Sequence, residues 1–225
     1  MTKHLALLRS GRWFGGLDDA LQRALLDAAR PVTLGDGALL FARGDPADGL
    51  YAVLDGALRI QGSSANGKEA LLIRLEPPNW FGEIAVFDGL PRTHDARADG
   101  ETTLLHVPAA PLRALLDAEP RRWHALGLLV AAKLRLALMT LEEAALFPAP
   151  VRLAKRLALM ADAYGEASPR RVVRAKQDEL AAMLALSRQT VNQLLKDLEA
   201  AGVVRVRWGE LEIVDAEALA RRAEG

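Results

Sequence analysis

One segment of the chain carries side chains that together could bind a small anionic ligand. It runs from Trp80 to His94, with Gly82 and Glu83 expected to begin a short helical turn and Arg92 and Thr93 placed after a Gly-Leu-Pro turn. Amide groups at a helix start, a guanidinium and a hydroxyl together favour binding of a phosphate. The carboxylate suits a sugar hydroxyl instead. The alternative interpretation is an ordinary β-turn closed by an Arg–Glu ion pair.

A second segment has the pattern of two short helices joined by a tight turn. Gln177 to Leu184 predicts the first helix, Leu186 closes the turn, and Ser187 is a natural N-cap for the second. The second helix would bury its leucine and valine face and expose Arg, Gln and Asn side chains, which can hydrogen-bond base edges in the major groove. The alternative is an ordinary helical hairpin. The candidate DNA-binding residues are Lys176, Gln177, Ser187, Arg188, Gln189, Asn192, Gln193 and Lys196.

The residues that follow favour DNA binding. Val203–Arg207 and Leu211–Val214, joined by a turn at Trp208–Glu210, predict a β-hairpin that would complete a winged helix. Between Arg170 and Arg207 there are eight Lys and Arg residues against four Asp and Glu residues, although the whole chain has a net charge of zero. This local surplus suits phosphate contacts and equally an ordinary solvated surface.

The first half of the chain predicts a β-rich domain. Between Val32 and Val107 short apolar runs are separated by glycines, which indicates an antiparallel sandwich or barrel. A helix is expected over Leu17–Ala29, and Asp55-Gly56 and Asn66-Gly67 are hairpin signals. The runs of strand length are Ala38–Phe41, Leu50–Leu54, Ala57–Gln61, Ala70–Leu75 and Thr102–Val107.

A long apolar helix, expected from about Arg121 to Phe147, lies between the two halves. Its length of roughly 40 Å and its apolar stripe favour a connecting, dimerising helix over a buried helix of a single domain. Lys133 and Arg135 interrupt the apolar run, so a transmembrane span is not expected. Phe147–Pro150 is a candidate hinge. The stripe consists of Trp123, Gly127, Val130, Leu134, Ala137, Leu141 and Ala144.

Several other kinds of chemistry are not supported by the sequence. There is no cysteine, which excludes disulfides, thiolate metal sites and cysteine-ligated iron–sulfur clusters. The four histidines are scattered without metal-ligand spacing; His94 could touch a ligand, and His106 is expected to face outward from a strand. No nucleophile elbow or P-loop occurs, so we expect neither an enzyme nor a catalytic site. The first ten residues lack a signal-peptide layout, and a cytoplasmic location is expected.

The runs Phe41–Asp45, Leu50–Gly56, Phe81–Thr93 and Gln177–Glu199 resemble the Crp–Fnr (cyclic AMP receptor protein) family of transcriptional regulators. The resemblance implies an α+β fold. It would comprise a cyclic-nucleotide-binding-like β jelly roll in residues 1–120, a central dimerisation helix in 121–147, and a winged helix-turn-helix in 148–225. It also implies three partners, namely double-stranded DNA, a second copy of the chain and RNA polymerase, and no membrane.

By the same resemblance, Glu83 would hold a ribose hydroxyl, and Arg92 and Thr93 the cyclic phosphate. The implied effector site consists of Gly82, Glu83, Ile84, Ala85, Arg92 and Thr93. In the bacterial cyclic AMP sensor, neighbouring Thr and Ser hydroxyls on the central helix reach the adenine. The matching positions here are Ala137 and Leu138, which cannot hydrogen-bond a base, and Thr140 lies almost one turn away.

The effector therefore stays open among cyclic AMP, cyclic GMP and cyclic di-GMP, with no metal expected. Thr93 at the phosphate position resembles cyclic-GMP-selective members of the wider superfamily. There are two alternatives to a ligand-controlled DNA-binding regulator. One is the same regulator with a ligand-free structural barrel, and the other is a nucleotide sensor that acts through protein contacts. The resemblance places Ser187, Arg188, Gln189 and Gln193 at DNA-reading positions. The cyclic AMP receptor has Glu and Arg where this chain has Gln189 and Gln193, so a different half-site is predicted.

Overall fold

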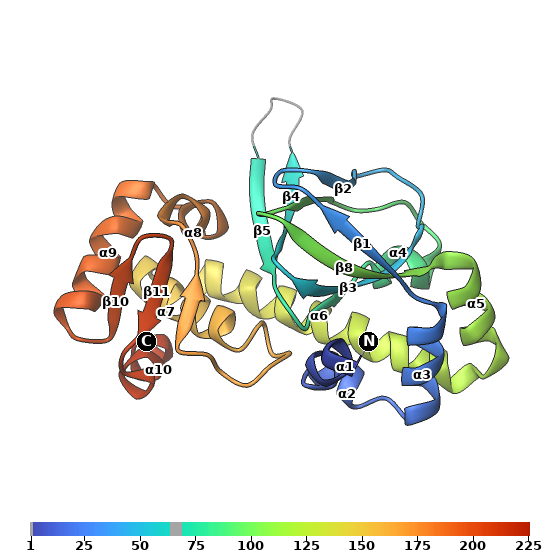
Figure 1. Ribbon diagram of the computed structural model, residues 1–225. Helices are drawn as coiled ribbons and strands as arrows, with labels where there is room; N and C mark the ends of the chain where they lie inside the picture. The colour runs from blue at the N-terminus through green and yellow to red at the C-terminus, as the bar shows by residue number, and fades with distance from the viewer. Residues whose placement is uncertain (1, 64–68) are drawn as a thin grey trace.

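The computed structural model describes residues 2–63 and 69–225 (Figure 1). Its helices are α1 (Thr2–Arg9), α2 (Arg12–Gly15), α3 (Asp19–Ala28), α4 (Glu83–Asp88), α5 (Ala109–Ala118), α6 (Pro120–Leu146), α7 (Ala149–Ala161), α8 (Gln177–Leu184), α9 (Arg188–Ala200) and α10 (Ala216–Glu224). Its strands are β1 (Arg30–Leu34), β2 (Leu39–Phe41), β3 (Gly49–Asp55), β4 (Leu58–Ser63), β5 (Glu69–Leu75), β6 (Trp80–Phe81), β7 (Asp95–Ala98), β8 (Thr102–Pro108), β9 (Val172–Arg174), β10 (Val204–Arg207) and β11 (Glu210–Ile213).

Two four-stranded antiparallel sheets form the N-terminal half. One has the order β1-β8-β3-β6 and the other β2-β7-β4-β5, so strands distant in sequence are neighbours in both. This confirms the expected jelly roll. The predicted hairpin signal Asn66-Gly67 lies outside the described residues, while β4 and β5 on either side of it pair antiparallel.

Aromatic side chains fill the space between the two sheets. Phe41, Tyr51 and Phe81 pack on one another, with Tyr51 and Phe81 stacked at 5.4 Å between ring centroids. A second core lies beneath the N-terminal helices, where Phe14 stacks on the fully buried Trp80. Burial of such rings stabilises the jelly roll and fixes the strands that carry the candidate site.

The expectation that His106 faces outward is wrong. Its side chain is only 4% exposed and stacks on Tyr51 with 4.3 Å between ring centroids. Residues alternate between two faces along β8, and both faces are covered, one by the opposite sheet and the other by helices. Strand alternation alone could not show that the second face is covered.

Helix α6 spans 27 residues and carries a row of exposed apolar side chains. Leu134 is 59% exposed and Leu138 is 57% exposed, whereas Leu126 and Leu129 on the other face pack into the core. By length and composition α6 could cross a membrane, which for a single helix is weak evidence. Of the predicted stripe, Leu134, Ala137, Leu141 and Ala144 are exposed, whereas Trp123, Gly127 and Val130 are partly buried. The exposed Ala131, Leu138 and Ala145 lie beside it.

The C-terminal unit comprises α7 to α10 and the three-stranded sheet β10-β11-β9 around one apolar core. The predicted helix pair is present as α8 and α9. Ser187 caps α9, since its hydroxyl accepts a hydrogen bond from the amide of Thr190 at 3.0 Å. Hairpin β10–β11 follows directly, which gives the order of elements expected for a winged helix-turn-helix.

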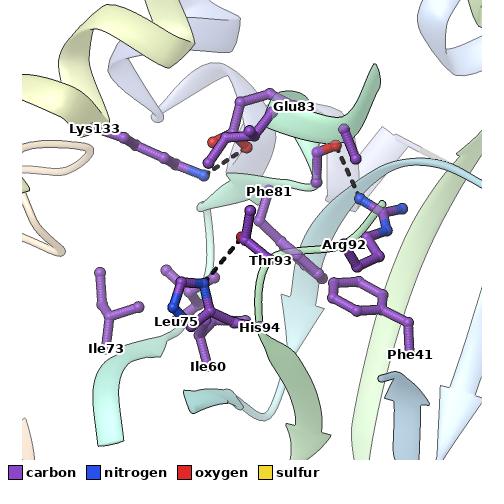
Figure 2. A pocket seen from close by; sticks show the side chains of 13 residues that line it. Phe41, Ile60, Ile73, Leu75, Phe81, Glu83, Arg92, Thr93, His94 and Lys133 are labelled. Atoms are coloured by element: carbon purple, nitrogen blue, oxygen red, sulfur yellow. Dashed lines mark hydrogen bonds and ion pairs between the residues drawn. The ribbon is translucent and has the colours of Figure 1, made fainter. Parts of the chain in front are cut away.

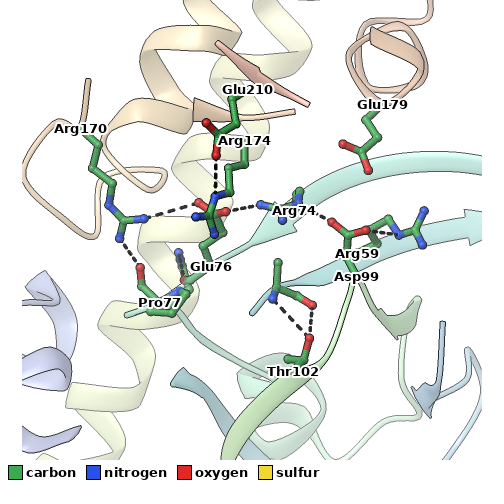
Figure 3. Close-up of polar contacts among 12 residues, drawn as sticks. Arg59, Arg74, Glu76, Pro77, Asp99, Thr102, Arg170, Arg174, Glu179 and Glu210 are labelled. Carbon is green, nitrogen blue, oxygen red and sulfur yellow. Dashed lines mark hydrogen bonds and ion pairs between the residues drawn. The ribbon is translucent and has the colours of Figure 1, made fainter. Parts of the chain in front are cut away.

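Strand β5 joins the two halves of the molecule. Ile73 and Leu75 pack into the jelly roll. Arg74, between them, lies on the opposite face of the strand and forms an ion pair with Glu76, the residue directly after the strand. Glu76 also pairs with Arg170 of the C-terminal unit, with 3.5 Å between Oε2 and Nη1, and this network is drawn in Figure 3. One strand therefore contacts the barrel interior on one face and the C-terminal unit on the other.

Candidate functional site

A cavity opens at the side of the jelly roll, beside α4 and α6. Its volume is about 140 Å³, and it is open to solvent on one side. The floor is apolar, and Glu83, Arg92 and Thr93 of the segment Trp80–His94 contribute polar groups to the lining (Figure 2). Every candidate effector residue, Gly82, Glu83, Ile84, Ala85, Arg92 and Thr93, lines it together with Phe41, Ile60, Ile73, Leu75, Phe81, His94 and Lys133.

Arg92 is held firmly at the back of this cavity. It is 4% exposed, and it donates hydrogen bonds to the carbonyl oxygens of Gly82 at 2.9 Å and Gly49 at 2.8 Å. Its guanidinium carbon lies 4.3 Å from the centroid of the Phe41 ring. The buried Nε of Arg92 has no hydrogen-bond partner. A buried cation with an unused donor is suited to an anion that enters the cavity.

Gly82 allows Arg92 to approach this closely. Its φ is 93°, in the left-handed region that favours glycine, and a Cβ there would lie 2.7 Å from the guanidinium of Arg92. A side chain at this position would displace the guanidinium. Gly82 is thus a steric requirement of the site.

Asp48 balances the charge of Arg92 and was not predicted from the sequence. It forms an ion pair with Arg92 and accepts a hydrogen bond from the hydroxyl of Tyr51. Partial burial would raise the pKa of Asp48, but the hydrogen bonds from Tyr51 and Arg92 outweigh it and hold this pKa below its usual value. Burial, together with the hydrogen bond to the same carboxylate, raises the pKa of Tyr51. Asp48 is therefore ionised at neutral pH and fixes Arg92 in place.

Glu83 meets a partner that the sequence did not reveal. It is 2% exposed, and its carboxylate lies 2.8 Å from Nζ of Lys133 on α6. Lys133 also donates to the carbonyl oxygen of Trp80 at 2.7 Å. This ion pair ties the central helix directly to the cavity wall (Figure 2). A ligand hydroxyl that binds Glu83 would have to share the carboxylate with Lys133.

Thr93 and His94 form the outer rim of the cavity. Their side chains lie 2.9 Å apart between Oγ1 and Nδ1. Burial, together with the nearby guanidinium of Arg43, holds the pKa of His94 below its ordinary value, so its ring is neutral at pH 7. A neutral imidazole offers one donor and one acceptor to a ligand.

The three candidate base contacts lie outside the cavity lining. Ala137 and Leu138 are exposed on α6, and the hydroxyl of Thr140 is hydrogen-bonded to the carbonyl oxygen of Leu136 at 2.9 Å. The single chain therefore does not bring these residues to Glu83 and Arg92. They stay a prediction for an assembly in which a second α6 lies alongside.

The candidate DNA-binding residues lie at the start of α8 and along α9. Ser187, Arg188 and Gln189 are exposed, with Arg188 paired to Asp178 at 3.3 Å. Gln193 donates to Asp197 at 2.9 Å, and Asn192 is partly buried. Lys176 and Lys196 are exposed, and Gln177 is partly buried. No group of three or more His, Asp or Glu side chains that could hold a metal occurs in residues 2–63 and 69–225.

Two family models match this chain. A cyclic nucleotide-binding domain matches residues 31–119, which contain the jelly roll and its cavity. A Crp-like helix-turn-helix domain matches residues 151–222, which contain α8, α9 and the hairpin. The two models fall on the two halves in which the candidate sites lie.

Individual proteins match over almost the whole length. A CRP-like cAMP-activated global transcriptional regulator of Mycobacterium tuberculosis is 32% identical over 213 residues, which cover 93% of this chain and 95% of that protein. A cyclic AMP receptor protein of Thermus thermophilus is 32% identical over 205 residues, which cover 91% of this chain and 89% of that protein. The solved structure of a CRP/FNR-family regulator of Thermus thermophilus has a TM-score of 0.68 and 25% sequence identity. The match covers 87% of this chain and 99% of that chain.

Proposed function

Because this chain belongs to the Crp–Fnr family of transcriptional regulators, we propose that it is a homodimeric DNA-binding regulator whose jelly roll senses a cyclic nucleotide. Members of the family are transcriptional regulators rather than enzymes. One observation carries the sensing half of the proposal. A buried cation, Arg92, and a buried carboxylate, Glu83, line the same cavity, as a ligand with both a phosphate and a hydroxyl requires.

In the proposed complex Arg92 and Thr93 bind the cyclic phosphate, and Glu83 accepts a hydrogen bond from the ribose hydroxyl. The apolar floor, with Ile60 and Ile73, would lie against the sugar and base. Cyclic AMP is the first candidate because the names of both relatives refer to it. Cyclic GMP is the second candidate, since Thr93 offers a hydroxyl that could also meet a guanine, and cyclic di-GMP is the third.

The signal would pass from the cavity through Lys133 and β5. A nucleotide that shares Glu83 changes the ion pair to Lys133 and thus the position of α6. The same ligand would lie on Ile73, whose neighbour Arg74 belongs to the network with Glu76 and Arg170. Binding would shift the population between orientations of the C-terminal unit about the hinge at Phe147–Pro150. The size of that shift is limited by the ligand's differential affinity for the two orientations.

Two copies would pair through the exposed apolar row of α6. Spacings of four and three residues along Leu134, Leu138 and Leu141 suit a left-handed helix pair. We propose the division into an effector domain of residues 1–120, a dimerisation helix of 121–147 and a DNA-binding domain of 148–225. A two-fold dimer would recognise a near-palindromic operator with half-sites about one helical turn apart. The protein would act in the cytoplasm and contact RNA polymerase.

The DNA-binding half is tested by duplex selection. The wild-type protein is expected to enrich a near-palindromic sequence from a randomised 40-base-pair pool. Gln189→Ala should weaken binding to that sequence about 5- to 150-fold, because a bidentate side-chain contact to a base contributes roughly 1–3 kcal/mol of discrimination. Its affinity for a duplex of unrelated sequence should stay unchanged.

Fluorescence anisotropy with both duplexes measures these affinities. Arg222→Ala, which removes an exposed cation from α10, is the matched control and should leave both affinities nearly unchanged. Failure of the wild-type protein to enrich any duplex at low salt would instead favour a nucleotide sensor that works through protein contacts. If Gln189→Ala weakened binding to both duplexes equally, Gln189 would not contribute to recognition of the base sequence.

A further inference from the structure

One polar side chain in the lining of the cavity has no role in the complex proposed above. Arg92 and Thr93 are assigned to the cyclic phosphate, and Glu83 to the ribose hydroxyl. Lys133 already donates to Glu83 at 2.8 Å and to a backbone carbonyl oxygen at 2.7 Å. Of the lining residues that the structure describes, His94 is the remaining one with a polar side chain. It is therefore the side chain in the cavity that can hydrogen-bond the base.

The imidazole of His94 is held in place from two sides. His94 directly precedes β7, and β7 pairs antiparallel with β4. On β4, a Cβ added to Gly62 would lie 3.6 Å from Cδ2 of His94, so the ring lies against that strand. On its other side, Nδ1 lies 2.9 Å from Oγ1 of Thr93. Figure 2 shows the ring next to Thr93, on the side of the cavity away from Glu83.

The position of the proton on this ring follows from its neighbours. Burial and the guanidinium of Arg43 hold the pKa of His94 below its ordinary value, so the ring is neutral at pH 7 and carries one N–H. A phosphate oxygen only accepts hydrogen bonds, so Thr93 must donate its single hydroxyl proton to the ligand. Oγ1 of Thr93 then accepts a hydrogen bond from Nδ1–H of His94. Nε2 is left as an unprotonated acceptor.

We propose that Nε2 of His94 accepts a hydrogen bond from the exocyclic amino group of the purine base and thereby selects the nucleotide. Adenine and guanine each carry such a group, whereas hypoxanthine, the base of cyclic IMP, carries none. A base that presents a carbonyl oxygen or a C–H to Nε2 leaves this acceptor without a proton to share. The inference rests on the sensing function proposed above, and it assigns base recognition to the jelly roll rather than to α6.

Calorimetric titration of the full-length protein with cyclic AMP, cyclic GMP and cyclic IMP tests this contact. The wild-type protein should bind cyclic AMP or cyclic GMP at least about tenfold more tightly than cyclic IMP, because cyclic IMP leaves the acceptor unpaired. His94→Phe keeps a ring without nitrogen atoms, so it should bind the preferred nucleotide and cyclic IMP about equally. A purely structural effect of the substitution lowers both affinities alike and cancels in their ratio. His124→Phe, exposed on α6 and outside the cavity lining, is the matched control and should keep the wild-type preference.

Heteronuclear NMR spectra of the imidazole nitrogens give a second readout. The chain has four histidines, and the signals of His94 are those that disappear in His94→Phe. In the complex with the preferred nucleotide, Nδ1 should carry the proton and Nε2 none. A preference over cyclic IMP that survives in His94→Phe, or a proton on Nε2, would overturn the inference and leave the proposed sensor standing. If the wild-type protein binds no cyclic nucleotide, the sensing function and this contact fail together.

Discussion

Replacing Arg92 with alanine is expected to weaken cyclic-nucleotide binding by at least about 100-fold. Hydrogen bonds to charged groups contribute roughly 1.5–3 kcal/mol each, and the cyclic phosphate would lose at least two of them. Calorimetric titration of wild type and variant with cyclic AMP, cyclic GMP and cyclic di-GMP measures the loss. The nucleotide that binds the wild type and not the variant is the effector.

The variant needs a control because Arg92 also has structural partners. Without its guanidinium, the ionised Asp48 and the carbonyl oxygen of Gly82 lose a donor, which is expected to lower the thermal stability of the jelly roll. Thr93→Ala separates the two effects, since Thr93 is exposed and, among the described residues, its hydroxyl is hydrogen-bonded to His94 alone. It should weaken nucleotide binding about tenfold with unchanged thermal unfolding. Undiminished nucleotide binding by both variants would place the site elsewhere.

A double substitution of Leu134→Glu and Leu138→Glu is expected to convert the protein from a dimer to a monomer. Both leucines are more than half exposed in the single chain, at 59% and 57%, and lie one turn apart on α6. Pairing of two such rows buries apolar surface that otherwise contacts water, and carboxylates there would be desolvated and repel one another. Sedimentation equilibrium measures the association state, and anisotropy measures the affinity for the selected duplex, which should fall at least about 100-fold because one half-site is no longer engaged.

A matched variant distinguishes loss of this contact from a general effect of charge. Leu90→Glu changes a leucine of comparable exposure that lies outside α6, and it should leave the protein dimeric. A wild-type protein that sediments as a monomer would contradict the proposed dimer. So would a dimer that survives both glutamates on α6.

Short-range sequence signals predicted most of the framework. Ser187 could be assigned as an N-cap because the cap needs only its own hydroxyl and an amide three residues later. The start of α4 was expected at Gly82 and Glu83, and Gly82 indeed has the left-handed backbone that only glycine adopts freely. The strands of the jelly roll followed from apolar runs between glycine turns. Each of these features depends on neighbours in the sequence.

Contacts between distant residues were beyond the sequence patterns. The ion pair of Glu83 with Lys133 joins residues 50 positions apart, and that of Arg92 with Asp48 joins residues 44 apart. Lys133 was interpreted only as an interruption of the apolar helix, because the periodicity of a helix carries no information on what packs beside it. Arg170 and Glu76, which link the two halves, are 94 positions apart. Such pairings are set by the packing of whole domains.

The stripe predicted on α6 is exposed only in its second half, from Leu134 onward. Spacings of four and three fit several parallel rows on one helix, and the predicted stripe included Trp123 and Val130, which are partly buried. Trp123 packs edge-on against Phe87 of α4 within the same chain. The position of α4 shows why the start of the stripe is covered.

The affinity for the selected duplex, measured with and without saturating nucleotide, tests the central claim most directly. We predict that one of cyclic AMP, cyclic GMP and cyclic di-GMP raises this affinity about 5- to 150-fold, the usual range of coupling between two sites. The increase should disappear in Arg92→Ala, whose affinity without nucleotide should equal that of the wild type. An affinity that stays the same with all three nucleotides would contradict ligand control and leave the jelly roll as a structural barrel of a DNA-binding dimer.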